Sequence, residues 1–252
     1  MQYTLKKSLG QHFLKDEEVC RKIIAALAAD PFTHLVEVGP GGGALTKYLL
    51  RVPAITFLAV EVDAEKVTYL ESTYPAIKGR LLHKDFLEMA APFGVPFTVV
   101  GNFPYNISSQ ILFKILEWKE QVPLVIGMFQ KEVAQRVASA PGSKAYGILS
   151  ILVQAFYEVE YLFDVPPSSF QPPPEVMSGV IRLRRKDREP EWTSREDFTR
   201  LVKTAFNQRR KMLRNNSKSL FDAETLKEDI FNRRPEQLSI DEFAALTFKM
   251  NN

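Results

Sequence analysis

The segment from residue 97 to residue 105 joins an apolar run to an amide, a proline and an aromatic ring. Residues 97–101 predict a buried strand, and Asn102-Phe103-Pro104-Tyr105 predicts a rigid turn that ends it. Proline fixes its own φ and drives the preceding residue into extended geometry, so the turn would hold Asn102 and Tyr105 in set positions. An amino-bearing ring such as adenine suits this chemistry. Tyr105 can stack on it while the Asn102 oxygen and a carbonyl near Pro104 accept its N–H groups.

A second candidate site is the glycine-rich turn Gly39-Pro40-Gly41-Gly42-Gly43, which follows an apolar strand at residues 34–38 and precedes a helical pattern. Strand, glycine turn and helix form the context that a nucleotide-binding turn requires. Gly39, Gly41 and Ala44 satisfy a dinucleotide fingerprint, and Glu61 lies about 20 residues on, where a ribose-binding acid is expected. A nicotinamide oxidoreductase is therefore one alternative function. For the turn at Asn102–Tyr105, the alternative is a purely structural role, in which the turn ends a strand and Tyr105 packs in the core.

Three further features argue against a nicotinamide enzyme. Glu37 stands two residues before the first glycine, Asp85 ends the third predicted strand, and the Asn-x-Pro-Tyr turn ends the fourth. Because the carboxyl ends of parallel strands meet at one edge of a sheet, these groups should surround one ligand.

The elements that must position these residues alternate between strands and helices. This alternation predicts an α/β fold with a parallel, doubly wound sheet. Residues 150–165 are rich in β-formers and predict one long strand, and residues 177–184 predict the last strand. Residues 166–174 form a proline-rich loop around Phe170. The expected strands of the parallel sheet are residues 34–38, 55–60, 80–83, 97–100 and 123–129.

The C-terminal part has a helical pattern and a concentrated positive charge. Seven Lys or Arg and no Asp or Glu lie between Arg200 and Lys218, although the chain's net charge is only +3. Such a stripe on a near-neutral body is typical of polyanion binding, and a solvated helix face is the alternative. We place the domain boundary near residue 187, which gives a domain at 1–187 that holds the strand-end residues and a helical, polyanion-binding domain at 188–252.

Composition narrows the class of protein. The chain has 252 residues, 45% of them hydrophobic and 25% charged, as in a soluble globular protein. No apolar run approaches the ~20 residues that span a bilayer, and no secretory signal is visible. One cysteine and three histidines offer neither a disulfide nor a metal cluster. A cytoplasmic monomer without metal or membrane contact is expected.

The four strand ends together resemble those of the class I (Rossmann-like) S-adenosylmethionine-dependent methyltransferases. A closer resemblance, to the ribosomal RNA adenine N6-dimethyltransferases, covers about residues 8–217. The basic segment FNQRRKMLRN at 206–215, expected to be a helix, resembles the branch that acts on small-subunit RNA, the KsgA or RsmA type. The other matching motifs are GQHFL at 10–14, EVGPG at 37–41, GNFPYNIS at 101–108, QKEV at 130–133, SKAYG at 143–147 and PPSSFQPPP at 166–174.

The resemblance implies a set of site residues. S-adenosylmethionine would be bound by His12, Leu14, Gly39, Gly41, Glu61, Asp85 and Asn102. Catalysis would rest on Asn102, Pro104, Tyr105 and Phe170. RNA phosphates would be bound by Arg209, Arg210, Lys211 and Arg214. Two positions depart from the family: His12 stands where asparagine is usual, and Phe103 where an aliphatic residue is usual.

The implied substrate is a pair of adjacent adenosines in a hairpin near the 3′ end of small-subunit (16S) ribosomal RNA, within the immature subunit. The target base must leave its stack, and Tyr105 and Phe170 would hold its two faces at ~1–3 kcal/mol each. Asn102 would favour a tetrahedral N6 whose lone pair faces the methyl group. A carboxylate base is not required, because N6 becomes strongly acidic as it is alkylated.

Other functions stay open at this point. A methyltransferase that acts on large-subunit RNA and confers antibiotic resistance shares the catalytic turn, and only the basic segment argues against it. A DNA adenine methyltransferase fits less well, because no separate target-recognition domain is visible. The chain could also act mainly as a ribosome-assembly factor whose binding matters more than its catalysis.

Overall fold

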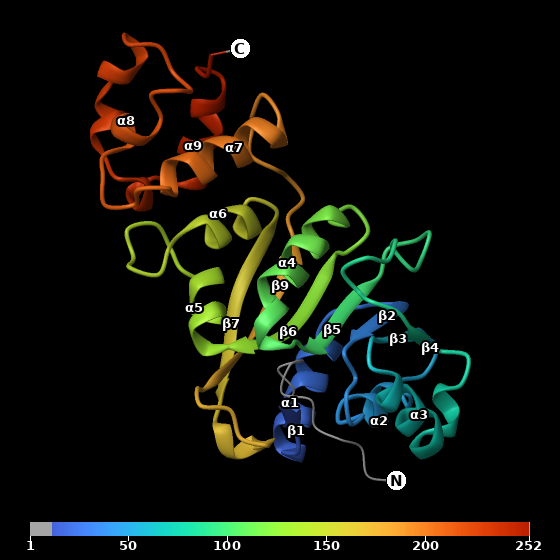
Figure 1. The fold of residues 1–252 in the computed structure, drawn as a ribbon. Coiled ribbons are helices and arrows are strands. Elements are labelled where there is room, and N and C mark those ends of the chain that lie inside the picture. Colours follow the sequence, from blue (N-terminus) through green and yellow to red (C-terminus); the bar gives the residue numbers. More distant parts are fainter. Residues whose placement is uncertain (1–11, 252) are drawn as a thin grey trace. The chain divides into compact units, whose positions relative to one another are not determined.

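The computed structural model describes residues 12–251 (Figure 1). The sequence of residues 4–14 lacks a clear period and predicts an arm that lies across other parts of the chain. Its first part, up to residue 11, lies outside the described residues. The chain divides into two compact units. One comprises Met1–Ala134 and Glu158–Arg185, and the other comprises Gln135–Tyr157 and Lys186–Asn252. The second unit thus includes residues 135–157, which precede the predicted boundary near residue 187. The division of function between domains 1–187 and 188–252 stays a prediction.

The first unit is built on a seven-stranded sheet with the order β4-β3-β2-β5-β6-β9-β7 (Figure 1). Neighbouring strands from β4 to β6 pair in parallel, as the alternation predicted. The strands are β2 (His34–Val38), β3 (Thr56–Glu61), β4 (Leu81–His83), β5 (Thr98–Asn102), β6 (Leu124–Gln130), β7 (Tyr157–Val165) and β9 (Ser178–Arg185).

The sheet is not parallel throughout, because β9, the last predicted strand, runs antiparallel to β6. The connection between β7 and β9 bears on the direction of β9 relative to its other neighbour, β7. It is the proline-rich loop, which contains the 3-10 turn Pro167–Ser169 and the short strand β8 (Phe170–Gln171) but no α-helix. A parallel neighbour would require a long crossover, usually helical.

Helices connect the parallel strands, and their starts can be explained locally. In α1 (Glu17–Ala28), the Asp16 side chain accepts the backbone N–H of Glu18 and of Val19, at 3.0 and 3.3 Å. This N-cap satisfies donors that the first turn leaves unpaired. The other helices of this part are α2 (Thr46–Leu49), α3 (Ala64–Thr73), α4 (Ser108–Glu117) and α5 (Lys131–Val137). None of the described helices is long and apolar enough to cross a membrane.

The expected strand at 150–165 is wrong in its first part, which forms the helix α6 (Ile148–Gln154). The Ser150 hydroxyl accepts the backbone N–H of Gly147 at 3.0 Å and so caps the start of this helix. Most of α6 is buried, so its sequence is apolar on nearly every side. A short continuous apolar run has no period that distinguishes a buried helix from a buried strand.

The second unit is helical apart from the start of β7, as predicted for the C-terminal part. Its longest helix, α7 (Arg195–Phe206), begins at Ser194, whose side chain accepts the Asp197 N–H at 2.9 Å. The apolar stripe of α7 is fully buried at Phe198, Leu201, Val202 and Ala205. Two further helices, α8 (Leu213–Asn216) and α9 (Ile240–Thr247), and three 3-10 turns complete the described part of the unit.

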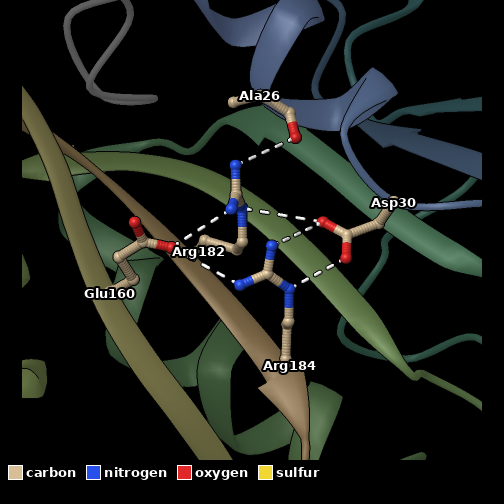
Figure 2. Close-up of polar contacts among 5 residues, drawn as sticks. All are labelled: Ala26, Asp30, Glu160, Arg182 and Arg184. Carbon is tan, nitrogen blue, oxygen red and sulfur yellow. Dashed lines mark hydrogen bonds and ion pairs between the residues drawn. The ribbon is translucent and has the colours of Figure 1, made fainter.

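An ion network ties the end of α1 to β7 and β9 (Figure 2). Arg184 donates to both oxygens of Asp30 in a two-pronged pair, at 2.8 and 3.0 Å. Arg182 donates to Glu160 at 3.1 Å and to the backbone oxygen of Ala26 at 3.2 Å. Only 11% of the Arg182 side chain is exposed, so its charge depends on these partners.

Replacing Asp30 by alanine is expected to destabilise the fold, because it leaves both guanidinium groups with Glu160 as their only carboxylate in the network. We expect a loss of roughly 1–3 kcal/mol, below that of a fully buried pair because Arg184 is 40% exposed. Glu160→Ala, at a side chain 55% exposed, should cost less. Urea unfolding measures both variants, and an equal or larger loss in Glu160→Ala would contradict this reasoning.

Candidate active site

A cavity of about 260 Å³ opens at the carboxyl ends of β2, β3, β4 and β5. It lies within the first unit. The structure brings together nearly all the residues of that unit that the sequence predicted. His12, Leu14, Gly39, Gly41, Glu61, Asp85, Asn102, Pro104 and Tyr105 all line the cavity, whereas Phe170 does not.

The glycine turn can form only with glycine at its key positions. Gly39 and Gly41 have φ values of +65° and +55°, in the left-handed region that side chains disfavour. A Cβ on Gly41 would also lie 2.8 Å from the Phe13 ring, which belongs to the short strand β1 (Phe13–Leu14). The turn therefore presents bare backbone to the cavity between β2 and the N-terminal segment.

Glu61, the last residue of β3, is held by the backbone on three sides. One carboxylate oxygen accepts the N–H groups of Val62 and Asp63 at 2.9 and 3.0 Å, and the other accepts that of Gly41 at 3.2 Å. Burial raises the pKa of Glu61, and these N–H groups oppose the shift. The carboxylate is thus fixed against the glycine turn, where its remaining lone pairs can accept two neighbouring hydroxyls.

Asp85 follows β4 and is half-buried at the wall of the cavity. One of its oxygens accepts the Leu87 N–H at 2.8 Å. Its second oxygen has no hydrogen-bond partner among residues 12–251, so it can accept an amino group of a ligand.

The Asn102 amide is oriented by the backbone of His12. Its Nδ2 donates to the His12 carbonyl oxygen at 2.9 Å. A carbonyl can only accept, so the amide nitrogen must face His12 and Oδ1 must point the other way. Oδ1 has no donor among the described residues. The N-terminal segment therefore sets Asn102 as an acceptor at the cavity wall.

Tyr105 is held at both ends of its side chain. Its ring stacks on the His12 ring, with centroids 5.4 Å apart and planes inclined by 28°. Its hydroxyl forms a hydrogen bond with Ser178 Oγ, and the Ser178 side chain is fully buried at the start of β9. Burial raises the pKa of Tyr105, so the hydroxyl stays protonated near neutral pH.

The sequence did not reveal that His12 and Ser178 hold Tyr105. His12 Nδ1 lies 3.0 Å from the backbone oxygen of Pro172, and because that oxygen only accepts, Nδ1 carries the proton. His12 thus links Asn102 and Tyr105 to the proline-rich loop. Ser178 stands far from Tyr105 in the sequence, and no local pattern pairs them.

Phe170 and Phe103 lie in the core. Phe170 is fully buried in β8, which pairs with β1. The structure does not place its ring beside Tyr105, so the predicted stacking of Phe170 on a base is not seen here and stays a prediction. Phe103 is 1% exposed and packs against Phe129, with ring centroids 5.0 Å apart. Space for its ring comes from Gly127, where a Cβ would lie 2.5 Å from it.

Glu37, beneath the glycine turn, is 2% exposed and accepts the Thr46 hydroxyl at 2.7 Å. Burial raises the pKa of Glu37 to about 8, against an ordinary 4.5. Between about pH 4.5 and pH 8, Glu37 therefore keeps its proton in the folded chain and loses it in the unfolded chain. The stability from Glu37 is fully present below about pH 4.5 and is lost as the pH rises through about 8.

The variant Glu37→Gln, neutral at every pH, should remove this dependence. We expect the difference in Tm, variant minus wild type, to increase as the pH rises from about 5 to about 8 and to stay constant above that pH. Thermal unfolding across this range is the measurement. A Tm difference that does not change with pH would mean that Glu37 keeps an ordinary pKa.

The basic segment lies in the second unit and is not the helix that was predicted. Helix α7 ends at Phe206 and α8 begins at Leu213, with a turn between them. The Asn216 side chain donates to the backbone oxygens of Ala205 and Gln208, at 2.8 and 3.0 Å. These bonds satisfy carbonyls at the end of α7, and Met212 then takes an extended conformation.

The four predicted RNA-binding residues differ in their surroundings. Arg210, Lys211 and Arg214 are exposed, whereas Arg209 is half-buried. The Arg209 guanidinium donates to the backbone oxygens of Ser143 and Lys144, at 3.3 and 2.5 Å. In the described part of the chain no group of three or more His, Cys, Asp or Glu is arranged to hold a metal ion.

Known proteins are similar to this chain over nearly its whole length. The profile of the family described as "Ribosomal RNA adenine dimethylase" matches residues 2–245. A Flavobacterium johnsoniae protein described as "Ribosomal RNA small subunit methyltransferase A" is 49% identical over 97% of this chain and 95% of its own. One of the same description from Bacteroides thetaiotaomicron is 49% identical over 96% and 92%.

Solved structures confirm the predicted class I methyltransferase fold. A dimethyladenosine transferase from Plasmodium falciparum superposes with a TM-score of 0.78 at 25% identity, over 92% of this chain and 94% of its own. The 23S rRNA methyltransferase ErmE has a TM-score of 0.70 at 23% identity over 92% and 99%, which bears on the fold alone. Since the family profile and the relatives both span nearly the whole chain, the chain belongs to the ribosomal RNA adenine dimethylase family.

Proposed function

We propose that this chain transfers methyl groups from S-adenosylmethionine to N6 of two adjacent adenosines in small-subunit (16S) ribosomal RNA, giving N6,N6-dimethyladenosine in a hairpin near its 3′ end. The observation that carries the proposal is the Asn102 amide at the cavity, whose nitrogen donates to the His12 carbonyl and whose oxygen has no donor among the described residues. The described function of the relatives supports the choice of small-subunit RNA.

The donor set of the cavity fits S-adenosylmethionine. Glu61 would accept the ribose hydroxyls, and the free oxygen of Asp85 would accept the adenine amino group. Gly39 and Gly41 would let the methionine part approach the backbone, and His12 and Leu14 would close the other side. When bound, the sulfonium supplies a methyl group that is already activated.

The chain's own task is to prepare the adenine amino group. Asn102 Oδ1 would accept one N–H, and the Pro104 carbonyl, which already accepts the Ile107 N–H at 3.3 Å, has a second lone pair for the other. Both bonds favour a tetrahedral N6 with its lone pair free, which stabilises the transition state more than the ground state. As the bond from N6 to the methyl carbon forms, the bond from that carbon to sulfur breaks and S-adenosylhomocysteine is the leaving group. N6 becomes strongly acidic as it is alkylated and loses its proton to water, so no nearby carboxylate is needed as a base.

Tyr105 would hold the target base by stacking after the base leaves its helix. We keep Phe170 as the proposed second ring. Because that ring is fully buried in the structure, its stacking would require the proline-rich loop to move.

In the cell, the substrate would be the immature small ribosomal subunit. The enzyme would act as a cytoplasmic monomer in the biogenesis of that subunit. Arg210, Lys211 and Arg214 would contact phosphates and position the RNA without reading its bases.

Primer extension on both ribosomal RNAs tests the choice of substrate. Small and large subunits that lack these methyl groups are incubated with the protein and S-adenosylmethionine. We expect a new stop at two adjacent adenosines of the small-subunit RNA and none on the large-subunit RNA. A stop only on the large-subunit RNA would assign the chain the other substrate.

A further inference from the structure

The half-buried Arg209 connects two separate pieces of the second unit. It stands in the turn between α7 and α8, and it donates to the carbonyls of Ser143 and Lys144, about 65 residues earlier in the chain. Both hydrogen bonds are donated by Nη2, so this edge of the guanidinium is tied to the backbone of the loop. Its charge stays within the turn at residues 207–212, which we call the basic turn.

The loop at residues 140–146 is fixed at further points. The Gly142 N–H donates to the Glu236 backbone oxygen at 2.6 Å, and the Tyr146 side chain is fully buried. The Ser143 hydroxyl accepts the Tyr146 N–H at 3.2 Å. The loop is therefore an ordered surface, which a substrate can use without first ordering it.

Lys144 is the cation that this loop adds to the surface. Its side chain is exposed, and its backbone oxygen lies 2.5 Å from Arg209. Among residues 12–251, no acid pairs with Lys144, Arg210 or Lys211. Glu236, which is half-buried, is bonded to this loop through its backbone oxygen and not through its carboxylate.

We propose that the RNA-binding surface of the second unit extends across the loop 140–146, with Lys144 as a phosphate contact. Arg209 is then the positioning residue that holds this loop against the basic turn, and Arg210 and Lys211 are direct contacts. Lysine is a point charge on a flexible stem and suits a phosphodiester whose position varies. This inference rests on the proposed function and makes it more specific by assigning Arg209 and Lys144 different tasks.

The salt dependence of RNA binding distinguishes these tasks. The slope of log K against log salt falls by roughly 0.7–0.9 for each phosphate contact that is lost. We measure it with the full chain and a small-subunit RNA fragment that carries the 3′-terminal hairpin. Lys144→Gln and Arg210→Gln should each reduce the slope by about this amount. Lys227→Gln, at an exposed lysine of the same unit paired with Glu224, should leave it unchanged.

A double-mutant comparison tests the positioning role. If Arg209 acts through the loop, Lys144→Gln should have little further effect on the slope in the Arg209→Gln background. An unchanged slope in Lys144→Gln would overturn the proposal, and so would a full additional loss in the double variant. Absence of wild-type binding to the fragment would instead contradict the proposed function.

Discussion

Asn102→Ala is expected to lower kcat for methyl transfer by about 10²–10³-fold, comparable to the loss of one hydrogen-bonding group that acts on the transition state. The variant removes the oxygen that would accept the adenine N–H. It also leaves the His12 carbonyl without its donor. Single-turnover transfer from methyl-labelled S-adenosylmethionine to isolated small subunits measures the rate without product release.

Asn102→Asp is the matched variant for this prediction. The carboxylate keeps an acceptor oxygen but cannot donate to the His12 carbonyl, so we expect a rate between those of the wild type and the alanine variant. Cofactor binding, measured by calorimetry, should survive in part, because Glu61 and Asp85 are untouched. Full activity in Asn102→Ala would refute the hydrogen-bond mechanism.

Tyr105→Ala should lower transfer by about ten- to a hundred-fold, because stacking of a base on an aromatic ring is worth ~1–3 kcal/mol and ~1.4 kcal/mol corresponds to a factor of ten. The loss should appear in kcat/KM for RNA. Tyr105→Phe keeps the ring and should lose far less. An alanine variant with the wild-type kcat/KM would show that the ring does not hold the base.

The buried partner of the Tyr105 hydroxyl gives this prediction a control. Ser178→Ala and Tyr105→Phe each break the same hydrogen bond. If Ser178 supports activity only through that bond, the double variant should be no slower than the slower single one. Additive losses would show that Ser178 acts in another way.

The sequence predicted the parts of the fold whose signal is local. The apolar run before Asn102 and the glycines after Val38 showed where two strands end. In a sheet of this kind ligands bind at the carboxyl ends of the strands, so these ends predicted the position of the site. It missed what depends on distant partners. Residues 148–154 are apolar on nearly every side, so their period did not show a helix. The direction of β9 depends on a loop rather than on its own residues.

The site shows the same division. Residue type and position predicted that Glu61, Asp85 and Asn102 would meet, because all three follow strands. The orientation of Asn102 by the His12 carbonyl is a backbone contact, which side-chain identity cannot reveal. Arg209 was grouped with its basic neighbours because sequence shows charge but not the partner that each charge has.

The identity of the methylated nucleoside tests the central claim most directly. Isolated small subunits are incubated with the protein and methyl-labelled S-adenosylmethionine, and the RNA is digested to nucleosides that are separated and counted. The account predicts that the label is recovered in N6,N6-dimethyladenosine and is lost in the Asn102→Ala variant. Label in a nucleoside methylated at a ring nitrogen or a ribose oxygen would contradict it, because the Asn102 oxygen would then face the wrong group.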